Sequence, residues 1–439
     1  MVTLTISNFS CIDSAEVTLA PMTVLIGPQA SGKSVISKLI YFFVHQVHAQ
    51  YSRAEEGLSF SDFNDQFALD FVKWFPPSAW GNGSFKVTFE AGKIKFVVQR
   101  PRRASRAFLD RVNVHASDFF KEFYSSILSD FDKARSRSKD EDSIPPWDVL
   151  YRVRHTAETR LSRQLGRDHI SYQLFIPAGR SFFTSVGKAI AVFDHGGLLD
   201  QITLRFGRQY ANVRERYAHI TVRRSLPSDQ QRENLMRKIF GGEVRFTRDQ
   251  EFVESPDGRK VPFSALSSGQ QELLPLWLTV SQFAYRGIAP NSKLPVDSQM
   301  VVIEEPEAHL FPSAQSSLVE YLSSVVSAAR QNRFMILTTH SPYVLSKINN
   351  LVLAGTSIPA TKDQIATLAK IVPRGSWLRQ NSLRAYAIKD RKVYNIVNEE
   401  DGLIDGGYLD SVSGEISEEF LKILKIMVGG GNAELPVDE

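Results

Sequence analysis

The sequence contains a single cysteine, Cys11, among 439 residues. One thiol excludes an intrachain disulfide and a zinc cluster built from cysteines, and it is typical of a reducing compartment. Long apolar runs are missing too: no stretch approaches 18 consecutive apolar residues, and Met1–Ile6 has no basic segment ahead of an apolar one. We therefore expect no membrane span, no signal peptide and a cytoplasmic location.

Internal repeats and low-complexity stretches are also missing. Hydrophobic residues make up 43% of the chain and charged residues 23%, an ordinary globular balance that excludes collagen-like and wholly disordered classes. At about 150 residues per domain, this length predicts two or three structural units with enough apolar material for a large core.

Positive charge is concentrated in the middle of the chain. The net charge is +4, but residues 101–240 carry 25 lysines and arginines against 16 aspartates and glutamates. Most of these cations are arginines, which bind phosphates and carboxylates bidentately and stack on bases. The segment is therefore suited to contacting DNA, RNA or an acidic protein. The competing interpretation is a solvated helical surface without a specific partner.

Apolar periodicity predicts strands that alternate with helices, which indicates the α/β fold class. We expect strands and hairpins over residues 2–7, 15–26, 85–98, 171–177, 243–262, 300–304, 334–339 and 384–396. We expect mainly helical segments over residues 33–47, 105–167, 181–240 and 416–427, and helices that begin near 270 and after 312. Breaks are expected at Pro145-Pro146, Gly196-Gly197, Pro227, the charged stretch 133–142 and the glycines 429–431.

A glycine-bearing loop follows the apolar strand Val24–Ile26 and opens a helix. It reads Gly27-Pro28-Gln29-Ala30-Ser31-Gly32-Lys33-Ser34, which matches G-x-x-x-x-G-K-S in the context that this motif requires. Its glycines let the backbone curl so that N–H groups point inward beside the positive end of the helix. Lys33 is suited to the β- and γ-phosphates and Ser34 to Mg²⁺, so the loop predicts ATP and Mg²⁺ as ligands.

Two adjacent carboxylates, Glu304 and Glu305, end the apolar run Met300–Ile303. The carboxyl ends of parallel strands are where α/β folds bind ligands. Glu304 is suited to holding Mg²⁺ directly or through water, and Glu305 to deprotonating the water that attacks the γ-phosphate. Acidic residues also end many strands without a catalytic role, so the pair gains its meaning from the phosphate loop upstream.

Two more segments place polar residues at the starts of expected helices. Ser267-Ser268-Gly269-Gln270 precedes one helix, where a serine and the helix dipole are suited to a γ-phosphate or, alternatively, form an ordinary N-cap. His340 follows the strand 334–339. It is suited to contacting a γ-phosphate oxygen or the catalytic water, and the alternative is a turn histidine satisfied by packing.

In their order along the chain, these segments resemble the motifs of ABC-type ATPase heads of the SMC, RecF and OLD group. The matching segments are Walker A (27–34), the signature loop (266–270), Walker B (300–305), an OLD-type D-loop (305–310) and a switch histidine, His340. The opening Ile6-Ser7-Asn8-Phe9 is also similar to this group. The motifs anchor residues 1–45, 171–181 and 243–345, and elsewhere the likeness is one of layout.

The resemblance implies a P-loop NTPase head with a mixed β-sheet core, antiparallel hairpins and a helical insertion. The implied divisions are a first ATPase lobe (1–100), a helical insertion (101–170), a core strand with a Q-loop-like segment (171–181), a helical arm (182–242), a second lobe (243–350) and a C-terminal extension (351–439). It also implies that two copies pair head-to-tail around two ATP molecules. Ser267 and Gly269 of one copy then complete the site built by the other copy.

Several residues depart from the family pattern. Glu304 stands where most ABC proteins have aspartate, and Ser268 replaces the first glycine of the usual signature. The loop in the position of the Q-loop contains no glutamine: Gln173 lies on the expected strand before it, and the loop itself carries Arg180. We expect Arg180 to face the nucleotide or the partner head, with an ordinary structural arginine as the alternative.

Residues 351–439 are too short for the nuclease domain of OLD proteins, and no long heptad arm of an SMC protein is present. Members without their own nuclease resemble components of bacterial anti-phage systems that act with a separate effector. The expected function is thus an ATPase whose ATP-dependent pairing controls an effector such as a nuclease. The alternatives are a RecF-like repair clamp that binds duplex DNA through the arginine-rich middle, a transporter subunit, and a scaffold that does not hydrolyse ATP.

Overall fold

The computed structural model describes most of the chain. The described residues are 1–81, 83–100, 112–137, 146–186, 199–219, 227–247, 250–285, 298–327, 332–356 and 361–405. Within these ranges, no helix is both long enough and apolar enough to cross a membrane.

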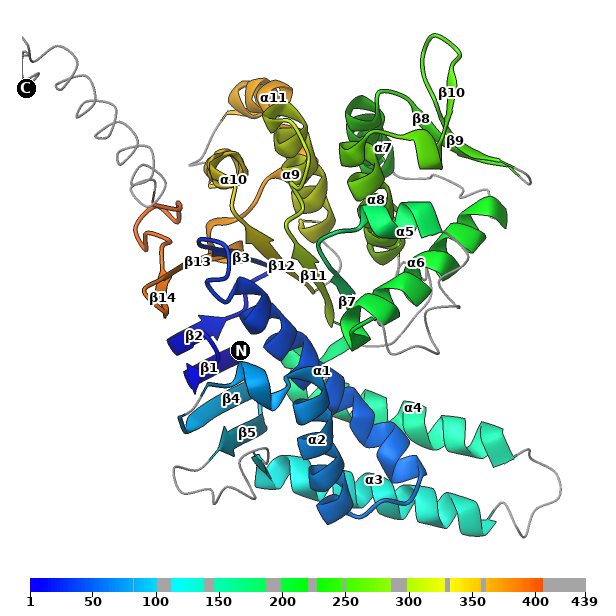
Figure 1. The fold of residues 1–439 in the computed structure, drawn as a ribbon, viewed down its shortest axis with the longest axis vertical. Coiled ribbons are helices and arrows are strands. Elements are labelled where there is room, and N and C mark those ends of the chain that lie inside the picture. Colours follow the sequence, from blue (N-terminus) through cyan, green and yellow to red (C-terminus); the bar gives the residue numbers. More distant parts are fainter. Residues whose placement is uncertain are drawn as a thin grey trace, which may run out of the picture.

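In this part of the chain, eleven strands form one sheet, in the order β6-β5-β4-β1-β2-β14-β13-β3-β12-β11-β7 (Figure 1). The strands are β1 (Val2–Phe9), β2 (Ile12–Thr18), β3 (Met22–Ile26), β4 (Phe85–Ala91), β5 (Ile94–Arg100), β6 (Asn113–Ala116), β7 (Ile170–Ile176), β11 (Ser298–Glu304), β12 (Arg333–Thr339), β13 (Leu383–Lys389) and β14 (Lys392–Asn395). The half from β6 to β2 is antiparallel, whereas β13, β3, β12, β11 and β7 run parallel. The expected mixed α/β class is confirmed.

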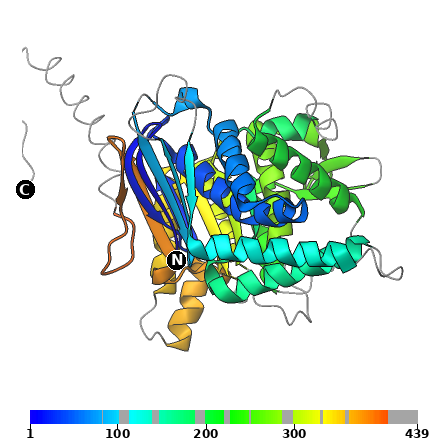
Figure 2. The same cartoon turned by 90° about the horizontal axis from the view of Figure 1, so that it is seen from below.

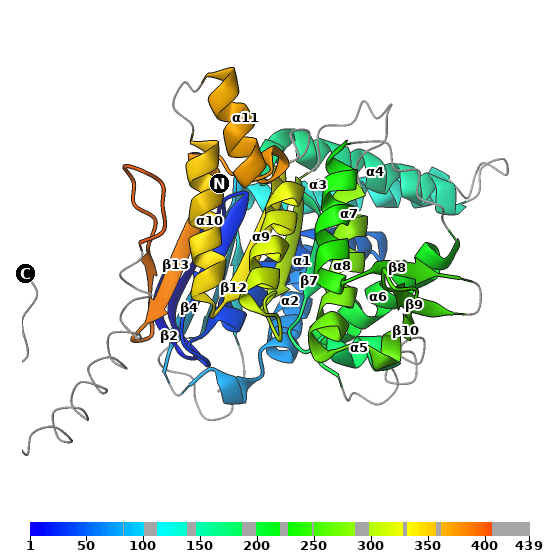
Figure 3. The ribbon, with the colours of Figure 1, turned by 90° about the horizontal axis from the view of Figure 1, so that it is seen from above.

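Helices cover both faces of the sheet (Figures 2 and 3). One face carries α1 (Lys33–Glu55), α2 (Phe60–Trp74), α3 (Asp118–Arg137) and α4 (Pro146–Leu165), and the other carries α9 (Pro312–Val326) and α10 (Pro342–Gly355). Beside the edge strand β7 lie α5 (Ser181–Val186), α6 (Gln201–His219), α7 (Pro227–Phe240), α8 (Ser268–Tyr285) and a small antiparallel sheet of β8 (Glu243–Phe246), β9 (Glu251–Glu254) and β10 (Lys260–Pro262). The short helix α11 (Lys362–Ile371) follows α10.

The central strands divide the apolar interior into two cores. In β11, Met300 and Val302 pack with α1, α2 and α3, while Val301 and Ile303 pack under α8, α9 and α10. All seven residues of β11 are buried. A parallel strand that is covered on both faces has no solvent-facing side that favours polar residues. This explains the uninterrupted apolar run Met300–Ile303 in the sequence.

Aromatic side chains fill the core between the antiparallel strands and α1. Phe43 of α1 stacks on Phe89 of β4 at a centroid distance of 5.2 Å, and Phe42 meets Phe67 and Phe71 of α2. Large aromatic pairs bury much apolar area and restrict how helix and sheet can slide past each other. The helix that follows the phosphate loop is thereby fixed against the sheet.

The expected strand over residues 15–26 is wrong, because the structure has two strands there. β2 ends at Thr18 and β3 begins at Met22. Pro21, just before β3, has no N–H to donate to a ladder, and its carbonyl accepts a hydrogen bond of 2.8 Å from Met335 N. The break lets β2 join the antiparallel half while β3 joins the parallel half.

Other boundaries also differ from the sequence prediction. Helix α1 continues to Glu55, Lys133–Arg137 are helical, residues 113–116 form a strand, and residues 243–262 hold three strands rather than two. Helices α2, α10 and α11 were not predicted. The remaining expected strands and hairpins are confirmed to within one or two residues, and Pro146 and Pro227 each begin a helix. The expected helix 416–427, the break at Gly196-Gly197 and the glycines 429–431 lie outside the described residues.

Two histidines meet where α1 packs against the start of β7. The rings of His48 and His169 have centroids 6.5 Å apart, and His169 is 4% exposed. Among the described residues, neither ring nitrogen of His169 has a hydrogen-bond partner. Burial lowers the pKa of His169 to about 4, with a smaller contribution from His48, and burial also lowers the pKa of His48 to about 4. Both rings are therefore neutral at physiological pH.

This neutral pair predicts a loss of stability in mild acid. Because the folded pKa of His169 lies below its ordinary value, the unfolded chain takes up the proton first as the pH falls. The contribution to stability is complete above pH 6.5 and falls by roughly 3 kcal/mol as the pH approaches 4. We expect the melting temperature of His169→Asn to fall less than that of the wild type when the pH is lowered from 7.5 to 5.0, as measured by calorimetry. The exposed His115→Asn serves as control, and equal losses in all three proteins would contradict the prediction.

Candidate functional site

The phosphate loop connects β3 to α1 through a tightly curled backbone. Ala30 and Gly32 have positive φ angles of 59° and 109°. A Cβ on Gly27 would lie 2.8 Å from Ser31 Oγ and 2.9 Å from Ile388 O, and one on Gly32 would lie 2.9 Å from Cys11 Sγ. Close packing thus requires glycine at both positions, and at Gly32 the positive φ requires it as well. Pro28, Gln29 and Ala30 are exposed at the tip of the loop, and Ser34 is exposed at the start of α1.

Lys33 lies over the loop and is almost fully buried, with 5% of its surface exposed. Its Nζ donates to Gly27 O and Pro28 O, each at 2.8 Å. Burial lowers the pKa of Lys33, and the nearby carboxylates of Glu305, Glu307 and Glu304 oppose this shift. The ammonium group is held by two carbonyls that a phosphate oxygen can replace as partners.

Parallel pairing brings the acidic strand end to the same edge of the sheet. Glu304 of β11 is in register with Thr338 of β12, and Thr339 is in register with Ile26, the residue before the phosphate loop. Glu304 is 7% exposed, whereas Glu305 has a φ of 44°, a left-handed conformation that costs on the order of 1 to 3 kcal/mol. The N–H of Glu305 donates to Thr338 O at 3.0 Å. The structure therefore places both carboxylates beside the phosphate loop.

His340 bridges the lysine and the second glutamate. Its Nδ1 lies 3.4 Å from Lys33 Nζ, and its Nε2 lies 3.1 Å from Glu305 Oε1. An ammonium group can only donate, so Nδ1 accepts, and Nε2 carries the proton that is donated to Glu305. Residues predicted from three distant segments thus form one continuous hydrogen-bonded chain.

The predicted signature residues, 266–270, make no described contact with the hydrogen-bonded chain of Lys33, His340 and Glu305. Ser267 N and Oγ each donate to Gln270 Oε1 at 3.0 Å, and Gln270 N donates back to Ser267 Oγ at 3.4 Å, which is a capping box at the start of α8. Gln270 Nε2 donates to Phe240 O at 2.7 Å, so its amide is committed within the chain. A Cβ on Gly269 would lie 2.6 Å from His309 O, so the helix start packs directly on the D-loop. Ser267 and Ser268 remain exposed.

Neither candidate for the Q-loop role points toward the phosphate loop. Arg180 is 0% exposed, and its guanidinium donates to the carbonyls of Pro177, Glu272, Glu304 and Glu305. Gln173 lies against α1, where its amide donates to Tyr41 O and accepts from His45 N, each at 3.1 Å. The expectation that Arg180 faces a nucleotide is not supported by this placement, because protein carbonyls occupy its donors.

Many arginines of the basic middle segment are paired within the chain. On α3 and α4, Arg152 pairs with Asp148, Arg154 with Glu158 and Arg160 with Asp130. Beyond them, Arg214 pairs with Glu251 and Arg237 with Glu243. Paired arginines project less net charge, so this arrangement favours the solvated helical surface over a nucleic-acid contact.

Unpartnered polar atoms show that the site fits a phosphate and a cation. Among the described residues, Ser31 Oγ, Glu304 Oε1 and Glu307 Oε2 are buried without a hydrogen-bond partner. Buried polar atoms normally find partners, so their grouping between a glycine cradle and an ammonium group fits a polar ligand. Carboxylate and hydroxyl oxygens are also the ligands that Mg²⁺ prefers.

Sequence reasoning missed two buried glutamates: Glu307, which fixes His340, and Glu272, which accepts from Arg180. Thr339 Oγ1 and His340 N donate to Glu307 Oε1 at 2.6 and 2.9 Å, and Glu307 is 9% exposed. Glu272, which accepts from Arg180 N at 2.8 Å, was also missed. The Glu305-Pro306-Glu307 spacing was visible in the sequence, but only the fold shows that its second carboxylate reaches the neighbouring strand.

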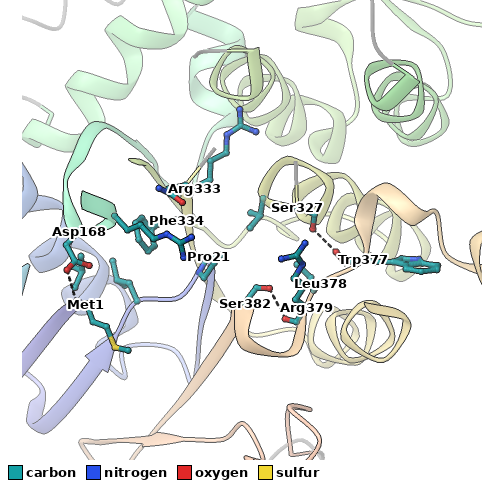
Figure 4. A pocket seen from close by; sticks show the side chains of 15 residues that line it. Met1, Pro21, Asp168, Ser327, Arg333, Phe334, Trp377, Leu378, Arg379 and Ser382 are labelled. Carbon is teal, nitrogen blue, oxygen red and sulfur yellow. Dashed lines mark hydrogen bonds and ion pairs between the residues drawn. The ribbon is translucent and has the colours of Figure 1, made fainter. Parts of the chain in front are cut away.

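A cavity of about 390 Å³ lies at the opposite edge of the sheet (Figure 4). Its lining includes Pro21, Arg333 and Ser382, which directly precede or begin the parallel strands β3, β12 and β13. The amino ends of these strands face away from the phosphate loop, so this cavity is not part of the candidate site.

Solved structures to which this chain is similar include SMC heads. The SMC head bound to the C-winged helix domain of ScpA is 11% identical over 91% of this chain and 98% of that one, with a TM-score of 0.41. An SMC head domain from Thermotoga maritima is 13% identical over 90% and 97%, with a TM-score of 0.35. Likeness at this level says nothing about activity, and no curated protein matches the chain.

A protein family does match, over the segment that contains every element of the site. Residues 22–346 fit the family described as an AAA domain, putative AbiEii toxin of a type IV toxin–antitoxin system. This match covers well over half of the chain, from β3 to α10. The protein belongs to this AAA-domain family.

Proposed function

We propose that this protein binds and hydrolyses ATP. The observation that carries the proposal is the chain of contacts from Lys33 through His340 to Glu305, at the carboxyl edge of three parallel strands. A phosphate loop, an acidic strand end and a histidine with these neighbours suit phosphoryl transfer to water. The AAA family to which the chain belongs generally binds ATP with Mg²⁺.

Each residue of the site has a distinct task in this proposal. Lys33 leaves the carbonyls of the loop and binds the β- and γ-phosphate oxygens, while the loop N–H groups bind the remaining charge. Ser34 and Glu304 would hold Mg²⁺, and the ion would supply positive charge beside the phosphates. Glu305 accepts a proton from the attacking water, and His340 fixes the orientation of that carboxylate.

Two copies sharing ATP molecules head-to-tail explain the exposed signature loop. Ser267 makes its described side-chain contacts only with Gln270, and Ser267 and Ser268 are exposed at the N-terminus of α8, whose cap is already formed. A helix N-terminus with exposed hydroxyls attracts phosphate oxygens. In the proposed assembly it lies over the γ-phosphate bound by the other copy, so hydrolysis separates the two copies.

The proposed outcome of this cycle is control of a separate effector protein, such as a nuclease, in anti-phage defence. The family description names a putative toxin and a toxin–antitoxin system, which supports a role in which a toxic activity is inhibited until it is needed. An ATP-dependent change of assembly is a suitable switch, because it couples one local event to a large rearrangement.

A RecF- or SMC-like clamp on DNA is the alternative function. The ion pairs on α4 weigh against it, although Arg163 of this helix and Arg167 in the turn just after it are exposed. ATP-dependent binding to duplex DNA that weakens steeply with salt, and that Arg163→Ala with Arg167→Ala abolishes, would favour the clamp.

Removing the ammonium group of Lys33 tests the nucleotide site. We expect Lys33→Ala to weaken ATP binding at least about 100-fold, because the cation that offsets phosphate charge is lost. Isothermal titration calorimetry measures this affinity. Lys38→Ala, on the same helix, controls for a general effect of losing a lysine. An unchanged affinity for Lys33→Ala would contradict the site assignment.

Removing the charge of Glu305 separates binding from hydrolysis. We expect Glu305→Gln to keep ATP binding, to slow turnover roughly 100-fold or more, and to accumulate a dimer or larger assembly with ATP. Turnover is measured by phosphate release and assembly by light scattering. Glu320→Gln, whose carboxylate pairs with Lys347 on the outer helices α9 and α10, is the matched control. Turnover of Glu305→Gln equal to that of the wild type would refute the role of base.

A further inference from the structure

A buried arginine ties the end of β11 to the helix that follows the signature loop. Arg180 Nη1 donates to Glu304 O at 2.6 Å and Nη2 donates to Glu305 O at 3.0 Å. On its other side, Nε donates to Glu272 O on α8 at 3.1 Å and lies 3.5 Å from the Glu272 carboxylate. One planar guanidinium therefore contacts both segments, in a region from which water is excluded.

Glu272 completes this connection from the helix side. It is 2% exposed, and its two carboxylate oxygens accept from Arg180 N at 2.8 Å and Ser181 N at 3.1 Å. The loop after β7, the start of α5 and the first turns of α8 lie side by side (Figure 1) and are held by one charge pair. Breaking one partner of such a pair leaves an uncompensated buried charge.

What the arginine holds is the strained backbone of Glu305. This residue has a φ of 44°, and its N–H and carbonyl are both fixed, by Thr338 O at 3.0 Å and by Arg180. A non-glycine residue keeps a left-handed conformation only where its surroundings impose it. The direction of the Glu305 carboxylate toward His340 therefore depends on contacts that begin at α8.

The same helix presents Ser267 to solvent at its start. Glu272 lies about one turn into α8, on its buried side, whereas Ser267 caps its exposed end. A displacement of the capped end by a ligand or a second copy moves Glu272, and with it Arg180 and the peptide of Glu305. Side chains that hold two segments at once are the physical means for such coupling.

We propose that Arg180 and Glu272 are positioning residues that transmit the position of the signature helix to Glu305. The proposal rests on the proposed ATPase function, but it concerns how the base is aimed and not whether ATP binds. A merely structural arginine would change stability and affinity together, whereas a positioning residue changes the rate of the chemical step at nearly constant affinity.

Three variants test this role. Arg180→Lys keeps the charge but loses the planar fork, Glu272→Gln keeps an acceptor but loses the charge, and Arg333→Lys is the matched control. Arg333 is also buried, and it donates to Val325 O at 2.7 Å and Ala284 O at 2.6 Å, far from the phosphate loop. Melting temperature, ATP affinity, turnover and amide hydrogen exchange are measured for each.

We expect Arg180→Lys and Glu272→Gln to bind ATP within about threefold of the wild type while turnover falls about tenfold or more. Amide exchange in residues 305–310 should accelerate about tenfold, with exchange in β11 unchanged. Arg333→Lys should keep wild-type turnover and wild-type exchange in that segment. Wild-type exchange at 305–310 in both site variants, or affinity and turnover that fall in parallel, would overturn the proposal.

The exchange measurement separates this proposal from the proposed function. If the wild type binds ATP without hydrolysing it, the proposed hydrolysis is wrong, and the exchange comparison still decides whether Arg180 holds Glu305. If the wild type hydrolyses ATP and the two variants do so at its rate, the ATPase stands and the positioning role is wrong.

Discussion

The parallel pairing of β3, β12 and β11 is the constraint on which the whole site depends. It aligns three strand ends at one edge of the sheet, so the phosphate loop, His340 and the two glutamates emerge as neighbours although up to 313 positions separate them in the chain. A shift of one residue in either pairing would turn every side chain of the shifted strand to the opposite face of the sheet. The two apolar cores, one on each face, resist such a shift because each accepts only its own half of the strand residues.

Neighbouring groups of the protein balance much of the charge at this edge of the sheet. Lys33 is buried among the carboxylates of Glu304, Glu305 and Glu307, and these oppose the effect of burial on its pKa. Arg180 lies behind the same carboxylates and is satisfied by carbonyls. Among the described residues, the partners of the Lys33 ammonium group are two carbonyls and an imidazole, and unpartnered oxygens lie in the same site. Such an arrangement suits a polyanion together with a cation.

The sequence predicted the mixed α/β class and the segments that meet at the candidate site, while the roles of the residues in that site stay predictions. Lys33, Glu305 and His340 were identified because each chemical motif depends on local residue types that follow a strand. The break at Pro21 was missed because a short turn between two apolar strands has nearly the periodicity of one strand. Glu307 and Glu272 were missed because their partners, Thr339 and Arg180, come from other segments, and no local pattern records such pairing. For Arg180 the contacts with protein carbonyls favour the structural alternative, which the sequence had left open.

The central claim is that one copy of the chain supplies the phosphate loop and another supplies the signature serine. A mixed assembly of Ser267→Arg and Glu305→Gln subunits, co-expressed with two different tags and purified through both, tests it most directly. In a head-to-tail pair, one of the two sites combines an intact Glu305 with an intact Ser267. The account predicts that the mixed assembly hydrolyses ATP although neither variant does so alone. Turnover no higher than the sum of the two separate variants would contradict it.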